Sequence, residues 1–348
     1  MTQYLSYKLK VLSFASIMLV LYIHSDFKEP EISNMLWINN VQVLLSKMIG
    51  RCAVPLFYMI SGYLFFLKVP NGMRSIFDKM RKRIKTLFIP YIIGCLFFVA
   101  FSVLVAITPG TSKFINNSIF PLFKESWIRI IASVFYDTGT GEPLAFQLWF
   151  LRDLILIVLI SPIWYLGLKK MGVGLITIVF GTTFLNLPYI PSYAMFWFLL
   201  GGEITKYSNK INKRNKGVTF ALLFMFISIS QMLYSKATYW EELKIPIILL
   251  GIIGIWTLYD KLVDENFSLV QHRWLSKACQ YTFFIYLFHE PTLNIIRKLV
   301  VFVIGKNEVG YILSYMSSPF IFAIFAVVIG VFLKKYCKTA YYFCTGGR

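Results

Sequence analysis

Long apolar runs recur along this sequence, and they limit what the chain can fold into. Of its 348 residues, 57% are hydrophobic and 15% are charged, whereas a soluble domain has about 25% charged residues. The runs are roughly 15–25 residues long, and about 20 residues of helix cross the ~30 Å hydrocarbon core of a bilayer. The strands of a membrane barrel would instead alternate polar and apolar residues. The sequence therefore predicts an all-α fold, a polytopic transmembrane helix bundle.

We expect about ten spans within a single domain that covers residues 1–348. The expected spans are residues 9–25, 52–68, 86–108, 146–168, 172–187, 193–206, 217–234, 245–260, 279–304 and 310–333. The fifth and sixth spans are short and are joined by the two-proline turn LPYIPS, which is compatible with tilted or incomplete crossing. The longest loop, residues 109–145, is expected to form an interfacial cap.

Basic residues set the expected orientation. The net charge is +19, and the Lys and Arg residues gather in alternate short loops between the apolar runs. That pattern follows the positive-inside rule rather than the face of a nucleic-acid-binding protein. It predicts cytoplasmic N- and C-termini. The opposite loops hold most of the exposed acidic residues, namely Asp26, Glu29, Glu31, Glu241 and Glu242.

Several ionisable residues lie within the expected spans, where each costs roughly 2.5–3.5 kcal/mol at mid-membrane and is a functional candidate by default. Six of them share one depth toward the outer side: His24, Arg51, Arg152, Asp153, His289 and Glu290. Glu203 lies toward the inner end of its span. The shared depth predicts a single hydrated pocket.

Each of these residues also has a structural interpretation. His24 alone is typical of an interfacial histidine, and His272 in an inner loop is expected to be solvated. Arg152 and Asp153 are adjacent on one helix and do not face each other well. A structural role would therefore have them pair with other helices.

Two prolines strengthen the prediction of a pocket. Pro55 has no N–H and clashes with the carbonyl of Arg51, four residues earlier, so the second span should be loosened or kinked beside its arginine. Pro291 disfavours helical geometry at Glu290. Irregular backbone at membrane depth persists only when it is buried in protein or lines a wet cavity.

The Ser61-Gly62-Tyr63 sequence lies in the middle of the second span. Gly62 allows a neighbouring helix to approach closely, and Ser61 and Tyr63 can form hydrogen bonds across that approach. Ordinary small-residue packing is the alternative.

Two further features have simple interpretations. Lys8 and Lys10 precede the first apolar run as in a signal peptide, but no small-residue cleavage site follows, so we expect the run to remain as the first span. The five cysteines, Cys52, Cys95, Cys279, Cys337 and Cys344, form no C-x-x-C pair and are interpreted as packing residues, with no metal site.

Four motifs in order, VLSFASIMLVLYIHS, RCAVPLFYMISGYLFF, LWFLRDLI and YLFHEP, resemble the acyltransferase-3 family of bacterial integral membrane acyltransferases. The resemblance covers about residues 8 to 335. Many members have an arginine eleven residues before the first histidine, where this chain has Ser13, with Lys10 one turn earlier. No P-loop, dinucleotide fingerprint, H-E-x-x-H or nucleophile elbow is present.

The resemblance implies transfer of an acyl group, acetyl in our prediction, from cytoplasmic acetyl-CoA or another acyl-CoA to a hydroxyl of a cell-envelope or exported polysaccharide, a glycan or glycolipid acceptor. His24 is the expected base and Arg51 the expected oxyanion or substrate anchor. His289 or Glu290 would orient the acceptor or substitute as base. Ser61, Tyr63, Arg152 and Asp153 are candidate substrate-binding residues. A basic cluster is suited to the CoA phosphates or, equally, to anionic lipids: Arg74, Lys79, Arg81, Lys82, Arg83 and Lys85.

Two questions stay open at the level of sequence. The donor arrives from the cytoplasm, so either its pantetheine arm, ~20 Å long against a ~30 Å core, threads between helices, or an enzyme residue carries the acyl group. The alternative functions are a polytopic transporter, since broken helices and midplane charges also mark substrate pathways, and a non-catalytic membrane component of polysaccharide assembly.

Overall fold

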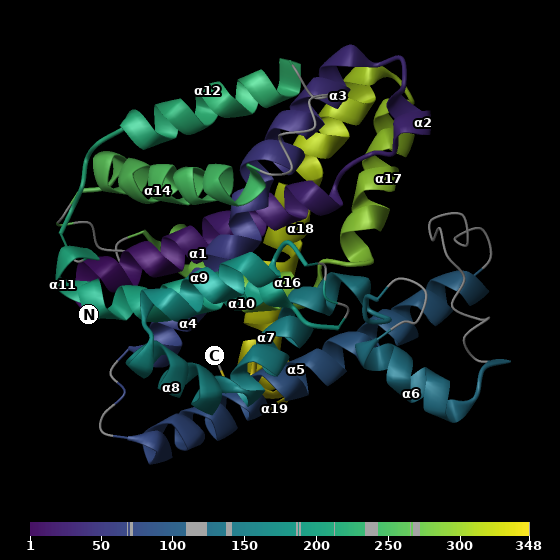
Figure 1. The fold of residues 1–348 in the computed structure, drawn as a ribbon. Coiled ribbons are helices and arrows are strands. Elements are labelled where there is room, and N and C mark those ends of the chain that lie inside the picture. Colours follow the sequence, from purple (N-terminus) through teal and green to yellow (C-terminus); the bar gives the residue numbers. More distant parts are fainter. Residues whose placement is uncertain are drawn as a thin grey trace. The chain divides into compact units, whose positions relative to one another are not determined.

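The computed structural model describes residues 1–67, 69, 72–108, 124–136, 141–185, 187, 189–211, 213–233, 243–264, 266 and 272–347. These residues form helices, turns and connecting segments, with no β-strand among them (Figure 1). Most of the expected cap over residues 109–145, the acidic residues Glu241 and Glu242, and part of the 261–278 loop lie outside the described residues. The predicted all-α class is confirmed for the part of the chain described.

The first half of the chain contains α1 (Gln3–His24), α2 (Glu29–Ile32), α3 (Leu36–Gln42), the π-helix η1 (Val43–Met48), the 3-10 helix η2 (Ile49–Cys52), α4 (Ala53–Phe66), α5 (Met73–Ile107), α6 (Trp127–Phe135), the 3-10 helix η5 (Phe146–Leu148), α7 (Trp149–Leu159) and α8 (Ser161–Lys170). The second half contains α9 (Val173–Thr182), α10 (Ser192–Ile204), the 3-10 helix η6 (Thr205–Tyr207), α11 (Ser208–Ile211), α12 (Thr219–Leu233), α14 (Lys244–Leu262), α15 (Arg273–Gln280), α16 (Thr282–Phe288), α17 (Thr292–Ile304), α18 (Glu308–Tyr336) and α19 (Lys338–Thr345).

Five helical segments in the described residues are long and apolar enough to cross a membrane: Gln3–His24, Leu36–Phe66, Met73–Ile107, Lys244–Leu262 and Glu308–Tyr336. A sixth span is possible if α7 and α8, which meet at 65°, form one broken crossing. The expected fifth and sixth spans correspond to α9 and α10, with 10 and 13 residues, which are short for a full crossing. A multi-pass helical membrane protein is therefore supported, and the total of ten spans stays a prediction.

The helix of the second span begins at Leu36, well before the expected start at residue 52. Polar residues along α3 and η1 lowered the apparent hydropathy there and hid the helix from the sequence pattern. Regular α-helical geometry gives way to a π-helix at Val43–Met48 and a 3-10 helix at Ile49–Cys52 before α4 begins at Ala53. The expected loosening beside Arg51 is confirmed.

The ninth expected span is also interrupted, beside Pro291 as the sequence predicted. Helix α16 ends at Phe288, α17 begins at Thr292, and His289 and Glu290 lie in the break. The broken backbone therefore carries two of the predicted site residues.

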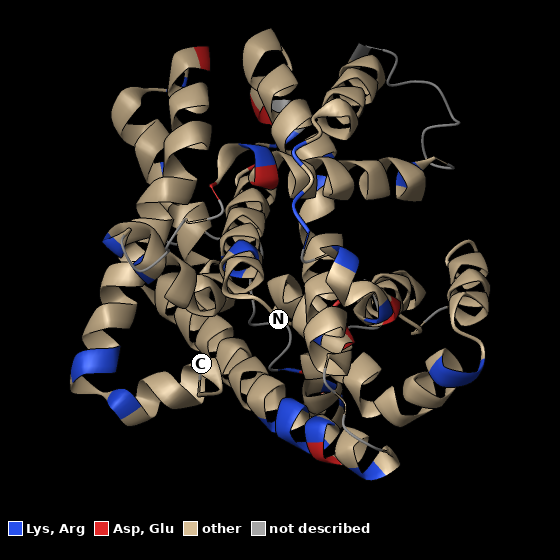
Figure 2. Cartoon of the chain, turned by 90° about the vertical axis from the view of Figure 1, so that its left-hand side faces the viewer, with Lys and Arg blue, Asp and Glu red and all other residues tan. Residues whose placement is uncertain are grey.

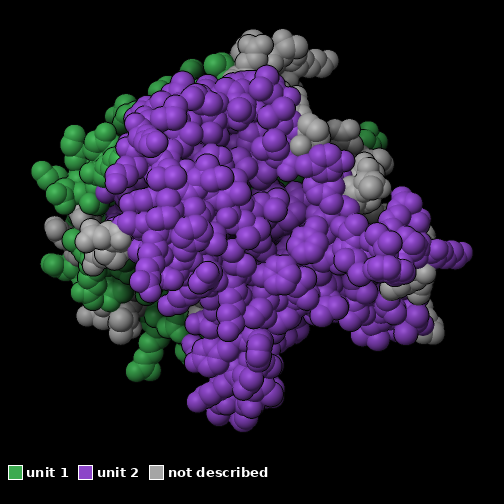
Figure 3. All heavy atoms as spheres, turned by 60° about the horizontal axis from the view of Figure 1, so that its bottom comes forward, with its two compact units in different colours: residues 1–60, 206–282, 296–324 green, residues 61–205, 283–295, 325–348 purple. Residues whose placement is uncertain are grey.

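The described residues divide into two compact units (Figure 3). Unit 1 comprises residues 1–60, 206–282 and 296–324, and unit 2 comprises residues 61–205, 283–295 and 325–348. Each unit is assembled from three separate segments of the chain. The single domain over residues 1–348 stays a prediction.

Within unit 1, α1 packs against η1, η2 and α15, and α12 lies along α14 (Figure 1). The α12–α14 contact is close because Gly254 has no Cβ: a Cβ there would lie 2.9 Å from Ala221 Cα. Within unit 2, α5 packs against α7, α8 and α19, and α10 packs against α9.

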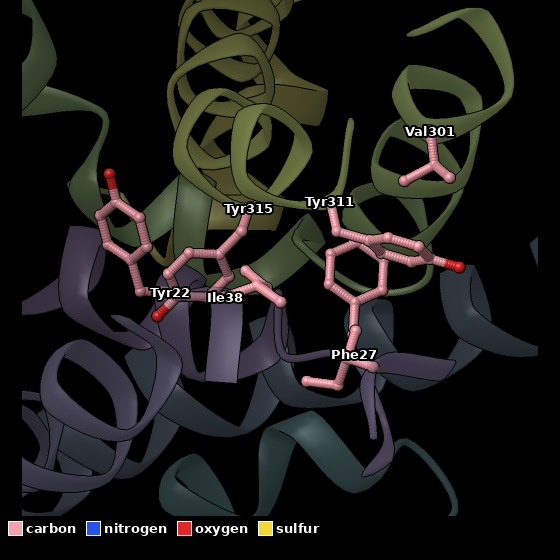
Figure 4. Close-up of a cluster of buried hydrophobic side chains, with 7 residues drawn as sticks. Tyr22, Phe27, Ile38, Val301, Tyr311 and Tyr315 are labelled. Atoms are coloured by element: carbon pink, nitrogen blue, oxygen red, sulfur yellow. The ribbon is translucent and has the colours of Figure 1, made fainter. Parts of the chain in front are cut away.

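A cluster of buried side chains follows the C-terminal end of α1 in unit 1 (Figure 4): Tyr22, Phe27, Ile32, Ile38, Val301, Tyr311 and Tyr315. The rings of Phe27 and Tyr311 meet edge to face with centroids 4.7 Å apart, and those of Tyr22 and Tyr315 lie 5.3 Å apart. This aromatic packing holds the segment after α1, which contains Asp26, against helices from distant parts of the sequence.

Candidate functional site

The C-terminal end of α1 meets the irregular helix that carries Arg51. His24 is the last residue of α1, Arg51 lies in η2, and both are partly buried. Helix α1 packs against η2, and a Cβ on Gly50 would lie 2.9 Å from Ile23 Cγ1. The residues that directly precede His24 and Arg51 are therefore in contact. A shared site for the two side chains stays a prediction.

Ser46 lies at the centre of a hydrogen-bonded group beside this end of α1. Its Oγ is 2.7 Å from Asp26 Oδ1, 2.7 Å from the Tyr315 hydroxyl and 3.0 Å from the carbonyl oxygen of Tyr22. Ser46 is 4% exposed and Tyr315 is fully buried. The expectation that Asp26 is an exposed acid is wrong, because its carboxyl is partly buried among these groups.

Arg297 adds a positive charge to the same region. Its side chain is 7% exposed, its guanidinium donates a hydrogen bond to the Asp26 carbonyl, and it stacks over the Phe27 ring at 4.5 Å. Burial nevertheless raises the pKa of the Asp26 carboxyl from 3.8 to about 6, against the opposing effects of the Ser46 hydrogen bond and the charges of Lys47 and Arg297. Sequence reasoning missed Arg297, although a cation in the apolar run LNIIRKLVVFVI was the available signal.

In unit 2, the break between α16 and α17 fixes the orientation of a second histidine. His289 Nδ1 lies 2.6 Å from the carbonyl oxygen of Tyr286, and His289 is fully buried. Because a carbonyl oxygen only accepts, Nδ1 must carry the hydrogen, so the neutral ring keeps its lone pair on Nε2. The break thus presents His289 in the tautomer that suits a proton acceptor at Nε2.

Gln147 ties the same break to the start of α7. Its Nε2 donates to the Glu290 carbonyl at 3.4 Å, and the Tyr286 hydroxyl donates to the Gln147 carbonyl at 3.2 Å. Glu290 is 5% exposed and Gln147 is 1% exposed. These bonds link the break to the segment that precedes α7. The sequence offered no signal for Gln147.

Arg152 and Asp153 pair with each other, which corrects the expectation that adjacent residues on one helix would pair elsewhere. Arg152 Nη2 lies 2.9 Å from Asp153 Oδ1. The long arginine side chain folds back, and its Nη1 also donates to the carbonyls of Phe135 at 3.2 Å and Gly141 at 2.8 Å. The pair therefore fastens the end of α6 to α7, and a direct role in substrate binding stays a prediction.

Ser61 and Tyr63 flank a tight helix contact in unit 2. A Cβ on Gly62 would lie 1.9 Å from the carbonyl oxygen of Phe198, so α4 and α10 approach as closely as the glycine predicted. Ser61 is partly buried and Tyr63 is 5% exposed. The Tyr63 hydroxyl is buried and finds no hydrogen-bond partner among the described residues. Substrate binding by Ser61 and Tyr63 stays a prediction.

The basic cluster lies along the first turns of α5, where blue segments recur in Figure 2. Arg74, Arg81 and Lys82 are exposed and Arg83 is partly buried. Lys79 has a structural task instead, because its ammonium donates to the carbonyls of Phe65 at 3.0 Å and Leu67 at 2.7 Å, at the C-terminal end of α4.

The opposite end of α1 carries a buried ion pair that corrects the interpretation of Lys8 as a flanking charge. Lys8 Nζ lies 2.8 Å from Asp260 Oδ1, and both side chains are 1% exposed. The Tyr4 hydroxyl donates to the same oxygen at 2.6 Å, and the Asn215 N–H donates to Asp260 Oδ2 at 3.1 Å. Sequence reasoning missed this group because its members come from distant segments.

All five cysteines lie in described segments and are free thiols, with Cys52 and Cys95 buried. Among the described residues no group of three or more His, Cys, Asp or Glu side chains is arranged to hold a metal ion.

The fold and the buried polar groups define a multi-pass helical membrane protein with histidine, arginine and carboxyl side chains at the ends and breaks of its helices. A family model described as an acyltransferase domain matches residues 7–334. The chain therefore belongs to the acyltransferase-3 family, and the resemblance seen in the sequence is confirmed.

Among individual proteins, the chain is similar to the succinoglycan biosynthesis protein ExoH of Rhizobium meliloti (strain 1021). The two are 24% identical over 328 residues, which cover 87% of this chain and 81% of that protein. No solved structure matches the chain significantly.

Proposed function

We propose that this protein transfers an acyl group, specifically acetyl, from cytoplasmic acyl-CoA to a hydroxyl of a cell-envelope or exported polysaccharide. The observation that carries the proposal is the family match over residues 7–334, which contains every predicted site residue. The similarity to a protein named for succinoglycan biosynthesis supports a polysaccharide acceptor.

In the proposed reaction, the sugar oxygen attacks the thioester carbonyl, the C–S bond breaks, and the proton of the hydroxyl passes through a base to the departing CoA thiolate. His24 is the proposed base because imidazole titrates near neutrality. Arg51 is the proposed partner of the negative charge that develops on the carbonyl oxygen. The packing of α1 on η2 supports this pairing, since it brings the two backbone segments together.

His289 and Glu290 are proposed to orient the acceptor hydroxyl, with His289 Nε2 as an alternative base. The Nδ1 hydrogen bond to Tyr286 supports that role by fixing the tautomer. Ser61 and Tyr63 are proposed to bind the acceptor, with Arg152 and Asp153 positioning the wall beside it. The buried Tyr63 hydroxyl supports acceptor binding.

The donor side is proposed to be cytoplasmic, with both chain termini on that side of a bacterial inner membrane and ten spans in total. Arg74, Arg81, Lys82 and Arg83 would bind the phosphates of CoA. The exposure of three of these four side chains supports binding of an anionic group.

The test uses the full chain purified in detergent, acetyl-CoA labelled in the acetyl group, and envelope polysaccharide stripped of its esters. We expect acceptor-dependent CoA release with transfer of label to the polysaccharide. His24→Ala should lower kcat by about 10²–10⁴-fold, the contribution of a positioned base. His272→Ala is the matched control because His272 is exposed in an expected inner loop, and it should retain activity.

Solute flux in vesicles without thioester cleavage would replace the proposal with a transporter. Cleavage that is equal in the His24 and His272 variants, with both folded, would remove His24 from the mechanism while leaving the acyltransferase intact.

A further inference from the structure

The hydrogen bonds of Ser46 can be checked against the number of hydrogen atoms that its neighbours supply. Its Oγ lies within 3.0 Å of three oxygens, on Asp26, Tyr315 and the Tyr22 carbonyl. A full hydrogen bond at each of the three contacts requires one hydrogen between the two oxygens. The Ser46 hydroxyl supplies one hydrogen and the Tyr315 hydroxyl supplies another. The Tyr22 carbonyl has none to give.

A separate hydrogen for each contact is present when the Asp26 carboxyl is protonated, whereas the ionised carboxylate leaves the Ser46 hydrogen to be shared between Asp26 Oδ1 and the Tyr22 carbonyl. In the protonated arrangement, Asp26 and Tyr315 both donate to Ser46 Oγ, and Ser46 donates to the Tyr22 carbonyl. A hydroxyl accepts two hydrogen bonds and donates one, so all three contacts are satisfied.

Ionisation of Asp26 removes one hydrogen and rearranges the group. The carboxylate can only accept, and it attracts the Ser46 hydrogen more strongly than a neutral carbonyl does. Ser46 then turns from the Tyr22 carbonyl, which keeps its hydrogen bond from the Ser25 N–H at 3.0 Å. The Tyr22 carbonyl in the last turn of α1 then loses the side-chain hydrogen bond that Ser46 gives it, while Ser25 Oγ still donates to the Leu21 carbonyl at 2.8 Å.

Tyr22 lies two residues before His24 in that last turn. We propose that Asp26 and Ser46 form a protonation-dependent cap on the last turn of α1, and that this cap positions His24. Its link to acyl transfer rests on the proposed function above.

The surroundings of Asp26 favour a change of protonation near neutral pH. The groups that act on it are Ser46 and Lys47 of η1, Tyr315 of α18 and Arg297 of α17, whose guanidinium binds the Asp26 backbone carbonyl. No acidic partner of Asp26 occurs among these groups. Burial raises the pKa of this carboxyl to about 6.

The first experiment measures the cap without using activity. Infrared spectra of the purified full chain are recorded against pH, and the carboxylic acid C=O band lost in Asp26→Asn is assigned to Asp26. We expect this band to titrate with a midpoint near the pKa of about 6. Ser46→Ala should move the midpoint upward, because the carboxylate loses a hydrogen bond. An unchanged midpoint in Ser46→Ala would overturn the cap.

The second experiment compares kcat/KM of Asp26→Asn with that of the wild type across pH, because the asparagine amide can donate to Ser46 at every pH. The ratio should be near one well below the pKa of Asp26. It should rise about two- to tenfold above it, the fold-change of one ordinary hydrogen bond. Asp264→Asn, at an exposed carboxyl, is the matched control and should give a flat ratio.

A flat ratio for Asp26→Asn in an active, folded enzyme would show that the cap does not position His24. If no acyl transfer is found, the proposed function fails, and the infrared titration still decides whether the cap exists.

Discussion

One aspartate lies beside each end of α1, and the two carboxyl groups differ in the partners that surround them. At the N-terminal end, Asp260 binds the Lys8 ammonium at 2.8 Å, the Tyr4 hydroxyl at 2.6 Å and the Asn215 N–H at 3.1 Å. At the C-terminal end, the Asp26 carboxyl binds the Ser46 hydroxyl at 2.7 Å. The first carboxyl thus has a cation and two further donors as partners, whereas the second has the Ser46 hydroxyl.

The contrast also separates stability from chemistry along one helix. The 22 residues of α1 span about 33 Å at 1.5 Å per residue, which is long enough to cross a ~30 Å bilayer core. Lys8 also stacks on Trp256, with Nζ 3.8 Å from the ring centroid, which fastens this end further. We therefore expect changes at the N-terminal end to affect folding and changes at the other end to affect pH dependence.

The largest effect is expected when the ion pair is broken. Lys8→Met leaves the Asp260 carboxylate buried without its cation, which costs about 3–5 kcal/mol of unfolding free energy. Equilibrium unfolding in mixed micelles measures the loss, and Lys10→Met at the exposed neighbouring lysine is the control. The double variant Lys8→Met/Asp260→Leu should recover most of the stability. Equal stability of Lys8→Met and Lys10→Met would end the comparison, because the ion pair would then contribute nothing.

The next effect is a pH dependence of stability from Asp26. Its pKa is raised from 3.8 to about 6 in the folded protein, so the folded state binds the proton more tightly than the unfolded state does. The contribution of Asp26 to the free energy of unfolding is therefore greatest below about pH 4 and is lost as pH rises through 6. Two pKa units correspond to up to about 3 kcal/mol, less where water screens the carboxyl. The free energy of unfolding of Asp26→Asn should lose this slope, measured from pH 4 to 7, while Asp264→Asn keeps it. A slope that survives in Asp26→Asn assigns the titration to another group.

A smaller loss of unfolding free energy is expected when Ser46, which contacts both Asp26 and Tyr315, is truncated. Ser46→Ala leaves Asp26 and Tyr315 without their shared partner and should cost about 1–2 kcal/mol at neutral pH. Ser33→Ala, at an exposed serine, should be neutral in the same micelle unfolding assay. A Ser46→Ala variant as stable as the wild type would show that water replaces the hydroxyl.

The smallest loss of unfolding free energy is expected at Tyr315, which contacts Ser46 through its hydroxyl. Tyr315→Phe keeps the buried ring and removes only the hydroxyl that lies 2.7 Å from Ser46. The loss should be about 0.5–1.5 kcal/mol, with Tyr336→Phe at an exposed tyrosine as control. A loss as large as that of Lys8→Met would mean that the two ends of α1 do not differ as described.

Much of the backbone was predictable because its causes are local. The apolar runs led to helices, Pro55 led to the irregular turn beside Arg51, and Pro291 led to the break that holds His289. Gly62 predicted the close contact that the Phe198 carbonyl makes with it. In each case the responsible residue lies within a few positions of its effect.

The polar groups were less predictable because their partners are distant in sequence. Asp26 was expected to be exposed, and only the approach of Ser46 and Arg297 from other helices shows that it is partly buried. Lys8 was expected to be a flanking charge, and only the approach of α14 shows its pairing. The fold of Arg152 back onto Asp153 depends on the carbonyls of Phe135 and Gly141.

The amino-acid sequence by itself determined that this chain is a helical membrane protein of the acyltransferase-3 family, because hydropathy and motif spacing act over short stretches of chain. The tertiary structure alone decided which carboxyl pairs with a lysine and which lies against a serine hydroxyl. That choice depends on a few ångströms between side chains of separate helices, a distance that no local pattern encodes.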